Sequence, residues 1–158
     1  MRAFLLGQLA VAQAAMGNGR AARNTLATAE KELSRADGRS PGVAIYHPAS
    51  LAHQQAVALA SLGDHSAAIR LLEISLRHRP IHERRSRLIT LGHLAELHAR
   101  SGRLELACHT WHQFLDDYPL VTCRRADSVL RRMRARVRSH RTSSATQALS
   151  ARAAEFSA

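Results

Sequence analysis

LAHQQAVALASLGDHSAAIRLLEISLRHRP, residues 51–80, decides the fold because it recurs 39 residues later as TLGHLAELHARSGRLELACHTWHQFLDDYP, residues 90–119. Small residues, a turn glycine, a leucine and a final proline recur at equivalent positions. Ala56, Ala60, Gly63, Ala68, Leu76 and Pro80 correspond to Ala95, Ala99, Gly102, Ala107, Leu115 and Pro119. A third copy, 46 residues before the middle one, keeps Ala10, Ala14, Gly17, Ala22 and Leu26. Such self-similarity is typical of stacked-repeat proteins, which usually offer a binding surface.

Each copy is expected to form a pair of helices. In the middle copy, small and apolar residues recur at helical spacing up to Leu59, which predicts one buried helix face. Gly63 should end this helix, since a left-handed residue costs least for glycine. Asp64 should then cap a second helix. That helix buries residues such as Leu72, and Pro80 prevents its continuation.

The composition favours an all-α protein. Alternating β-branched runs are absent, and the four prolines and eight glycines fall mostly between the helical stretches. No segment approaches the ~18 apolar residues of a membrane span, so no membrane partner is expected. We predict a repeat domain at 1–140 and a weakly ordered tail or short helix at 141–158. The domain would hold hairpins at about 1–34, 48–80 and 82–119, a loop at 35–48 after the first, and a basic capping helix at 122–139.

The repeat resembles the tetratricopeptide repeat. The shared order is small residue, bulky residue, turn glycine, small alanine, bulky residue and proline: Ala56, Leu59, Gly63, Ala68, Leu72 and Pro80, then Ala95, His98, Gly102, Ala107, Trp111 and Pro119. His98 departs from it, because the family has an aromatic residue there. The resemblance covers about residues 3–119 and implies a solenoid of αα-hairpins whose first helices line a concave groove.

By that resemblance, the groove would bind a peptide or a partner domain. Its positions map to Ser50, His53, Val57 and Ser61 in the middle copy and to Ile89, Glu96 and Arg100 in the last. We therefore expect a non-enzymatic protein–protein interaction module or scaffold, with self-association as a further expectation.

A narrower resemblance concerns the region from Leu76 to Met133 and the residues just after it. HERR at 82–85, FLDDYP at 114–119, RAD at 125–127 and MRAR at 133–136 are similar to the C-terminal repeat domain of actinobacterial helix-turn-helix transcriptional regulators. The resemblance implies a cytoplasmic role in transcriptional regulation. In that family a DNA-binding head precedes the repeats, whereas here the first repeat begins almost at Met1. A headless relative or a truncated reading frame is expected.

The basic segment at 124–141 holds eight arginines and one aspartate, and so supplies +7 of the formal charge of +11. Apolar residues at spacings of three and four predict one buried stripe, at Ala126, Val129, Leu130, Met133 and Val137. A terminal repeat needs such a helix as a cap with a polar outer face.

The alternative is a nucleic-acid-associated protein that uses these arginines, or one with another anionic partner. The residues concerned are Arg124, Arg125, Arg131, Arg132, Arg134, Arg136 and Arg138. No aromatic residue interleaves with them, so stacking on single-stranded bases is unsupported and DNA association would be weak or indirect.

No catalytic, cofactor or metal site is predicted. Cys108, His109 and His112 share one helix, but a catalytic zinc site needs three protein ligands and usually a nearby base, and HExxH is absent. Cys108 occupies the slot of Ile69, an apolar core position. A glycine-framed serine and a phosphate loop are also missing. Cys108 and Cys123 are interpreted as buried free thiols in a reducing compartment.

Secretion is the lowest-ranked alternative. The apolar run from Ala3 to Met16 mimics a short signal peptide with cleavage near Ala15. Gln8 and Gln13 interrupt the run, and cleavage would remove the first helix of the first hairpin.

Overall fold

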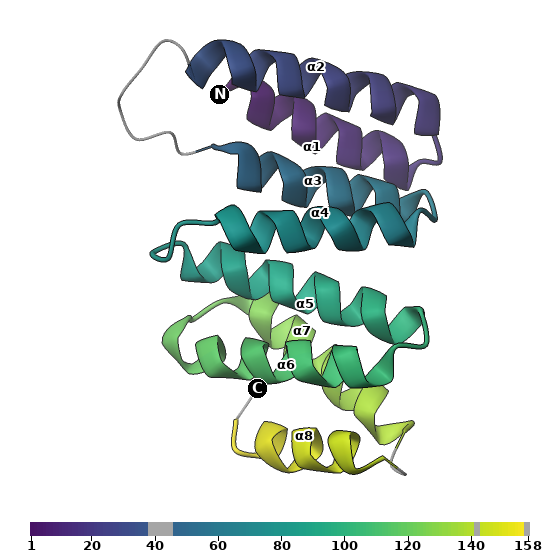
Figure 1. Ribbon diagram of the computed structural model, residues 1–158, viewed down its shortest axis with the longest axis vertical. Coiled ribbons are helices and arrows are strands. Elements are labelled where there is room, and N and C mark those ends of the chain that lie inside the picture. Colours follow the sequence, from purple (N-terminus) through teal and green to yellow (C-terminus); the bar gives the residue numbers. More distant parts are fainter. Residues whose placement is uncertain (38–45, 141–142, 157–158) are drawn as a thin grey trace. The chain divides into compact units, whose positions relative to one another are not determined.

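The structure is a computed structural model that describes residues 1–37, 46–140 and 143–156. The described residues form helices and no strand, which confirms the prediction of an all-α protein (Figure 1). The elements, in chain order, are α1 (Arg2–Ala15), α2 (Gly19–Asp37), α3 (Pro48–Ser61), α4 (His65–His78), α5 (Arg84–Arg100), α6 (Leu104–Asp117), the 3-10 turn η1 (Tyr118–Leu120), α7 (Arg124–Arg138) and α8 (Ser144–Ala154).

The predicted loop at 35–48 lies mostly outside the described residues, and its first three residues, 35–37, belong to the end of α2 instead. The chain divides into two compact units, Met1–Arg79 and Pro80–Ala158. None of the helices in the described ranges combines the length and the apolarity needed to cross a membrane.

The first unit contains two helical hairpins, α1–α2 and α3–α4, with α1 beside α3. Alanine supplies much of its core, which lets the helices approach closely. One buried cluster contains Ala10, Ala14, Ala22, Leu26 and Ala58. A second contains Ala3, Ala29, Leu33 and Leu51.

The hairpins turn through glycines with positive φ: Gly17 at 78°, Gly63 at 87° and Gly102 at 73°. At the middle turn, the Asp64 amide donates to the carbonyl of Leu59 at 3.0 Å, the bond that closes a helix ending in a left-handed residue. The Asp64 carboxylate then accepts from the Ala67 amide at 3.0 Å, which confirms the predicted cap. The turn chemistry read from the sequence is therefore correct.

The second unit contains the α5–α6 hairpin, with α7 packed on α5 and α8 packed on both α6 and α7. Its core is built from large side chains: Trp111, Phe114, Leu115, Leu130, Met133 and Leu149. All five residues of the predicted stripe on α7 are buried, which confirms that stripe. The tail region contains α8, whose Thr146, Leu149 and Ala153 are buried.

Gly92 sets the distance between α5 and α7. A Cβ atom at this position would lie 2.7 Å from Cγ1 of Val129, closer than side-chain atoms normally approach. The absence of a side chain at Gly92 therefore lets α7 lie directly against α5, which brings the basic helix to the face of α5 that carries the predicted groove residues.

Candidate interaction surface

The predicted groove residues lie on one helix of each unit. Ser50, His53, Val57 and Ser61 share a face of α3, whereas Ile89, Glu96 and Arg100 share a face of α5. Most of them are half-buried, and Ser61 and Arg100 are exposed. Helix α3 belongs to the first unit and α5 to the second, so the two sets are parts of different units.

The α3 set offers little chemistry for recognition. The Ser61 hydroxyl donates to the backbone carbonyl of Val57 at 3.0 Å, so it is engaged within its own helix. The Ser50 hydroxyl lies 3.5 Å from Nε2 of His47. None of the four predicted positions carries a carboxylate or a guanidinium group, so this face has no strong charge of its own.

The α5 set lies beside arginines of α7. Nη2 of Arg136 is 2.7 Å from Oε1 of Glu96, which joins the two helices through an ion pair. His93 lies on the same face of α5, and its pKa is lowered by burial and then by the positive charges of Arg132 and Arg125, against a smaller opposing effect of Glu96. We call this region the α5/α7 surface, made of Ile89, His93, Glu96, Arg125, Arg132 and Arg136.

Sequence reasoning missed His93 in this region. Its position gave a signal, because it follows Ile89 by four residues and precedes Glu96 by three, which is the spacing of one helix face. The arginines of α7 were predicted as a separate site, although the structure brings three of them to the groove residues of α5.

The seven arginines of α7 do not form a single stripe. Successive residues of a helix are about 100° apart around its axis. Arg125, Arg132 and Arg136 therefore lie on one side of the buried stripe, and the other four arginines lie on its other side. Arg134, in the second group, donates to the carbonyl of Ala153 at 2.5 Å and to that of Phe156, and so ties α8 to α7. The remaining members of this second group are Arg124, Arg131 and Arg138.

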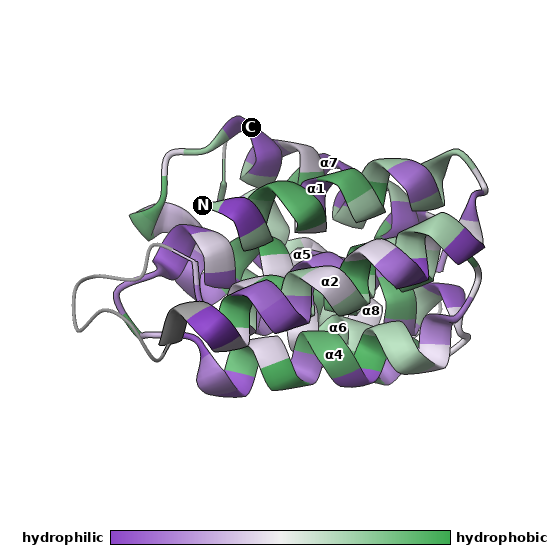
Figure 2. Cartoon of the chain, turned by 90° about the horizontal axis from the view of Figure 1, so that it is seen from above, coloured by the Kyte–Doolittle hydropathy of each residue, from purple (hydrophilic) through white to green (hydrophobic). Residues whose placement is uncertain are grey.

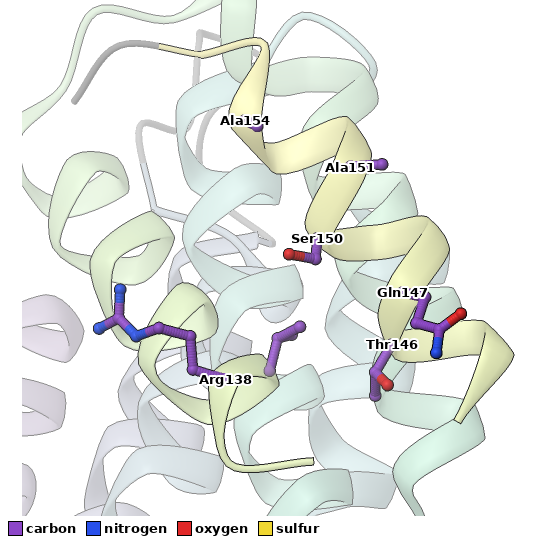
Figure 3. Close-up of a pocket in the computed structure, with 7 residues that line it drawn as sticks. Arg138, Thr146, Gln147, Ser150, Ala151 and Ala154 are labelled. Carbon is purple, nitrogen blue, oxygen red and sulfur yellow. The ribbon is translucent and has the colours of Figure 1, made fainter. Parts of the chain in front are cut away.

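A pocket of about 490 Å³ lies between α7 and α8 (Figure 3). Its lining includes Arg138 from α7 and Thr146, Gln147 and Ser150 from α8. Figure 3 shows the Arg138 guanidinium pointing away from Thr146 and Ser150. The pocket therefore has hydroxyl and amide groups on one wall without a convergent charge.

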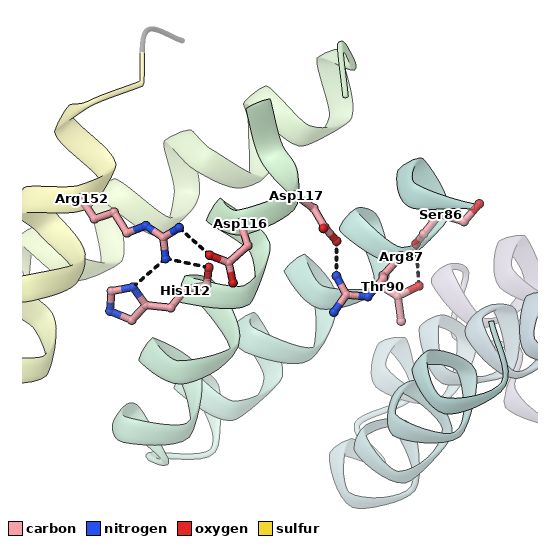
Figure 4. Close-up of polar contacts among 7 residues, drawn as sticks. All are labelled: Ser86, Arg87, Thr90, His112, Asp116, Asp117 and Arg152. Atoms are coloured by element: carbon pink, nitrogen blue, oxygen red, sulfur yellow. Dashed lines mark hydrogen bonds and ion pairs between the residues drawn. The ribbon is translucent and has the colours of Figure 1, made fainter. Parts of the chain in front are cut away.

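Other ion pairs hold helices of the second unit together (Figure 4). Arg87 of α5 pairs with Asp117 of α6. Arg152 of α8 lies 2.5 Å from Asp116 and donates to the His112 carbonyl at 3.2 Å. Each of these two guanidinium groups has an acceptor on a neighbouring helix, so the contacts stabilise the packing of the second unit.

Among the described residues, Arg125 and Arg132 differ from Arg87 and Arg152 in having no such partner. In the parts of the chain that the structure describes, neither of them forms an ion pair with a carboxylate, and both are exposed. The α5/α7 surface therefore presents two cations near the imidazole of His93, on the side of α5 that also carries Ile89.

The cysteines match their predicted burial. Cys108 is 2 % exposed and Cys123 is 5 % exposed, and both are free thiols. Burial raises the pKa of the Cys108 thiol, with a further contribution from Glu105, so this thiol stays protonated. Among the described residues, no group of three histidine, cysteine or acidic side chains converges in a way that could hold a metal ion.

Comparison of the chain with protein-family models, with curated proteins and with solved structures gives no match. Its function is therefore inferred from the geometry and charge of its own residues.

Proposed function

We propose that this protein is a non-enzymatic protein–protein interaction module built from TPR-like helical hairpins, and that its α5/α7 surface binds an acidic segment of a partner protein. The observation that carries the proposal is the position of Arg125 and Arg132 beside the groove positions of α5, without a carboxylate partner. A partner carboxylate would supply the missing counter-charge, and arginine can bind it through two parallel hydrogen bonds.

The mixed chemistry of the surface favours a peptide over nucleic acid. Ile89 offers apolar contact area, and Arg136 already has Glu96 as its partner. Tight binding to a phosphate backbone requires many simultaneous cation contacts. The arginines of α7 are split between two flanks, and Arg134 is engaged with the end of α8, which leaves few arginines on any one side.

The proposed setting is transcriptional regulation in the cytoplasm of an actinobacterium. Support for this setting comes from the resemblance of the segments at 82–85, 114–119, 125–127 and 133–136 to the repeat domain of helix-turn-helix regulators. In such a setting, the module would couple a partner protein to a regulator.

A charge-reversal pair with a matched control tests the proposal. Arg125→Glu/Arg132→Glu alters the α5/α7 surface, whereas Arg124→Glu/Arg131→Glu makes the same change in charge on the other flank of α7. The probe is a fluorescein-labelled peptide of alternating glutamate and leucine, followed by anisotropy. We expect the first pair to weaken binding at least tenfold, about 1.4 kcal/mol, and the control to weaken it less than threefold.

A DNA duplex serves as the second probe in the same assay. Tighter binding of the duplex than of the peptide, with equal losses in both double variants, would replace the proposal with the nucleic-acid alternative. Peptide binding that is equally weakened by the two pairs would mean attraction by net charge alone, and would overturn the assignment to the α5/α7 surface.

The His93 imidazole gives an independent readout by NMR titration. Its pKa is lowered by burial and by the charges of Arg132 and Arg125. A bound carboxylate offsets these charges, so the pKa of His93 should rise when the acidic peptide binds. An unchanged pKa at saturating peptide would place the binding site elsewhere.

A further inference from the structure

Helix α1 has a second apolar stripe on the side opposite to its core. The residues it buries, Ala3, Gly7, Ala10 and Ala14, follow one another at spacings of four, three and four. Leu5, Leu9, Ala12 and Met16 have the same spacing and lie about half a turn away. Leu5 is 59 % exposed, Leu9 48 % and Met16 79 %. Figure 2 shows hydrophobic residues along most of α1, and a helix that is apolar all round is normally buried.

The repeat itself shows what kind of structure covers this face. At the offset of 46 residues, the exposed stripe of α1 corresponds to Leu51, Gln55, Ala58 and Leu62 of the middle copy. In that copy the α1–α2 hairpin covers the face: Leu51 packs with Ala3, Ala29 and Leu33, and Ala58 packs with the Ala10 cluster. Gln55 also donates to Glu30 of α2. The same face on α1 therefore has the form that accepts a helix.

The lack of charged side chains on the exposed face of α1 favours an uncharged partner surface. Residues 3–19 contain no charged side chain, in a chain whose formal charge is +11. An acidic ligand would gain nothing at this face, and two copies approaching through basic faces would repel each other. The α1 face is one where a second copy can approach without that repulsion.

The spacing of the stripe is also self-complementary. We propose that α1 pairs with α1 of a second copy in an antiparallel, two-fold symmetric dimer. In that register Leu5 lies opposite Met16 of the other copy, and Leu9 lies opposite Ala12. A two-fold interface pairs the same patch with itself. Near its centre the large Leu9 would lie opposite the small Ala12, and large residues opposite small ones interdigitate well.

The size of the contact predicts a reversible dimer. Helix α1 has 14 residues and is about 21 Å long at 1.5 Å per residue. One helix from each copy buries less than the ~1,200 Å² that marks the lower limit of standard interfaces. The dimer should therefore dissociate on dilution.

Sedimentation equilibrium on the full chain tests the proposal, with Leu9→Glu as the variant and Leu106→Glu as its control. Leu9 and Leu106 are both 48 % exposed on helices, so the two substitutions add the same charge at equal exposure. We expect the unaltered chain to show a monomer–dimer equilibrium. Leu9→Glu should raise the dimer Kd at least 30-fold, and Leu106→Glu should leave it within threefold. Circular dichroism should show unchanged helicity in both variants.

Charge complementation then tests the symmetry. Residue 9 lies near the proposed two-fold axis, so Leu9→Glu and Leu9→Lys chains should each be monomeric and should form a dimer when mixed. A monomeric unaltered chain at every concentration, or a dimer that Leu9→Glu leaves intact, would overturn the proposal. Assembly that grows beyond the dimer with concentration would indicate an open head-to-tail contact and would also overturn it.

Discussion

Gly92 has a hydrogen atom at the position where any other residue has its Cβ atom. The ideal Cβ position lies 2.7 and 2.8 Å from the two Cγ atoms of Val129. A β-branched side chain such as valine has few rotamers into which it can retreat. The whole α5/α7 surface, with Arg125 and Arg132 beside α5, therefore depends on a glycine in the middle of a helix.

Gly92→Ala should destabilise the second unit. Alanine normally stabilises a helix interior by up to ~1 kcal/mol relative to glycine. Overpacking against Val129 should outweigh this gain and lower the free energy of unfolding by roughly 1–3 kcal/mol. Trp111, the only tryptophan of the chain, lies buried in this unit and reports its unfolding in urea by fluorescence.

The control for this prediction is the double variant Gly92→Ala/Val129→Ala, which removes the two Cγ atoms that the new methyl group would meet. It should recover stability relative to Gly92→Ala despite the loss of two buried methyl groups. A Gly92→Ala chain that is as stable as the unaltered one would show that α7 can move away from α5 at little cost.

At the scale of single elements, α7 shows which features a sequence can predict. Its buried stripe was predictable because the spacing of Ala126, Val129 and Met133 is a property of the helix itself. The roles of its arginines were not, since Arg136 meets Glu96 forty residues earlier in the chain and Arg134 meets the end of α8. These partners depend on how the helices pack, which no local pattern encodes.

The difference between local patterns and long-range packing also explains why the turns were predictable and the tail was not. Gly63 and Asp64 predicted the middle turn because its backbone geometry and its cap are both local. The tail remained open between weak order and a helix because its short, alanine-rich sequence has little pattern. In the structure α8 is held by contacts with α6 and α7, including those of Arg152 and Arg134.

Arg152→Ala should loosen α8 while leaving α6 in place. The guanidinium of Arg152 binds both Asp116 and the His112 carbonyl, and hydrogen bonds to a charged group contribute about 1.5–3 kcal/mol where they are buried. Arg152 is a third exposed, so we expect a loss of about 1 kcal/mol and roughly fivefold faster amide exchange in α8. Hydrogen exchange with mass spectrometry measures this for peptides covering 144–154.

Arg138→Ala is the matched control, because Arg138 is exposed and its guanidinium points away from α8 (Figure 3). It should leave exchange in α8 unchanged. Equal exchange in the Arg152→Ala and unaltered chains would mean that the apolar contacts of Leu149 and Ala153 alone hold this helix.

At the scale of the whole molecule, the two units differ in what fills their cores. Most buried apolar residues of the first unit are alanines, accompanied by a few leucines and Ile69. The second unit buries Trp111, Phe114 and Met133. Burial of apolar surface stabilises by about 25 cal/mol per Å², so the larger side chains give the second unit the greater hydrophobic stabilisation.

Heating should therefore unfold the chain in two steps. Circular dichroism at 222 nm measures the loss of helicity in both units, whereas Trp111 fluorescence reports only the second. We expect the loss of helicity to begin at the lower temperature, by about 5 °C or more for each kcal/mol of difference in stability between the units. Coincident transitions in the two signals would instead indicate one cooperative unfolding event.

The three left-handed glycines also have a consequence for folding kinetics. Each joins two helices through a turn of only a few residues, and the entropy lost on closing a loop rises with its length. The α1–α2, α3–α4 and α5–α6 hairpins can therefore close independently, before the longer stretch between Asp37 and Pro48 brings α3 to α1. Chains rich in such local contacts reach the native state quickly. In a newly made chain, the α1–α2 hairpin leaves the ribosome before the α3–α4 hairpin, so it can form first.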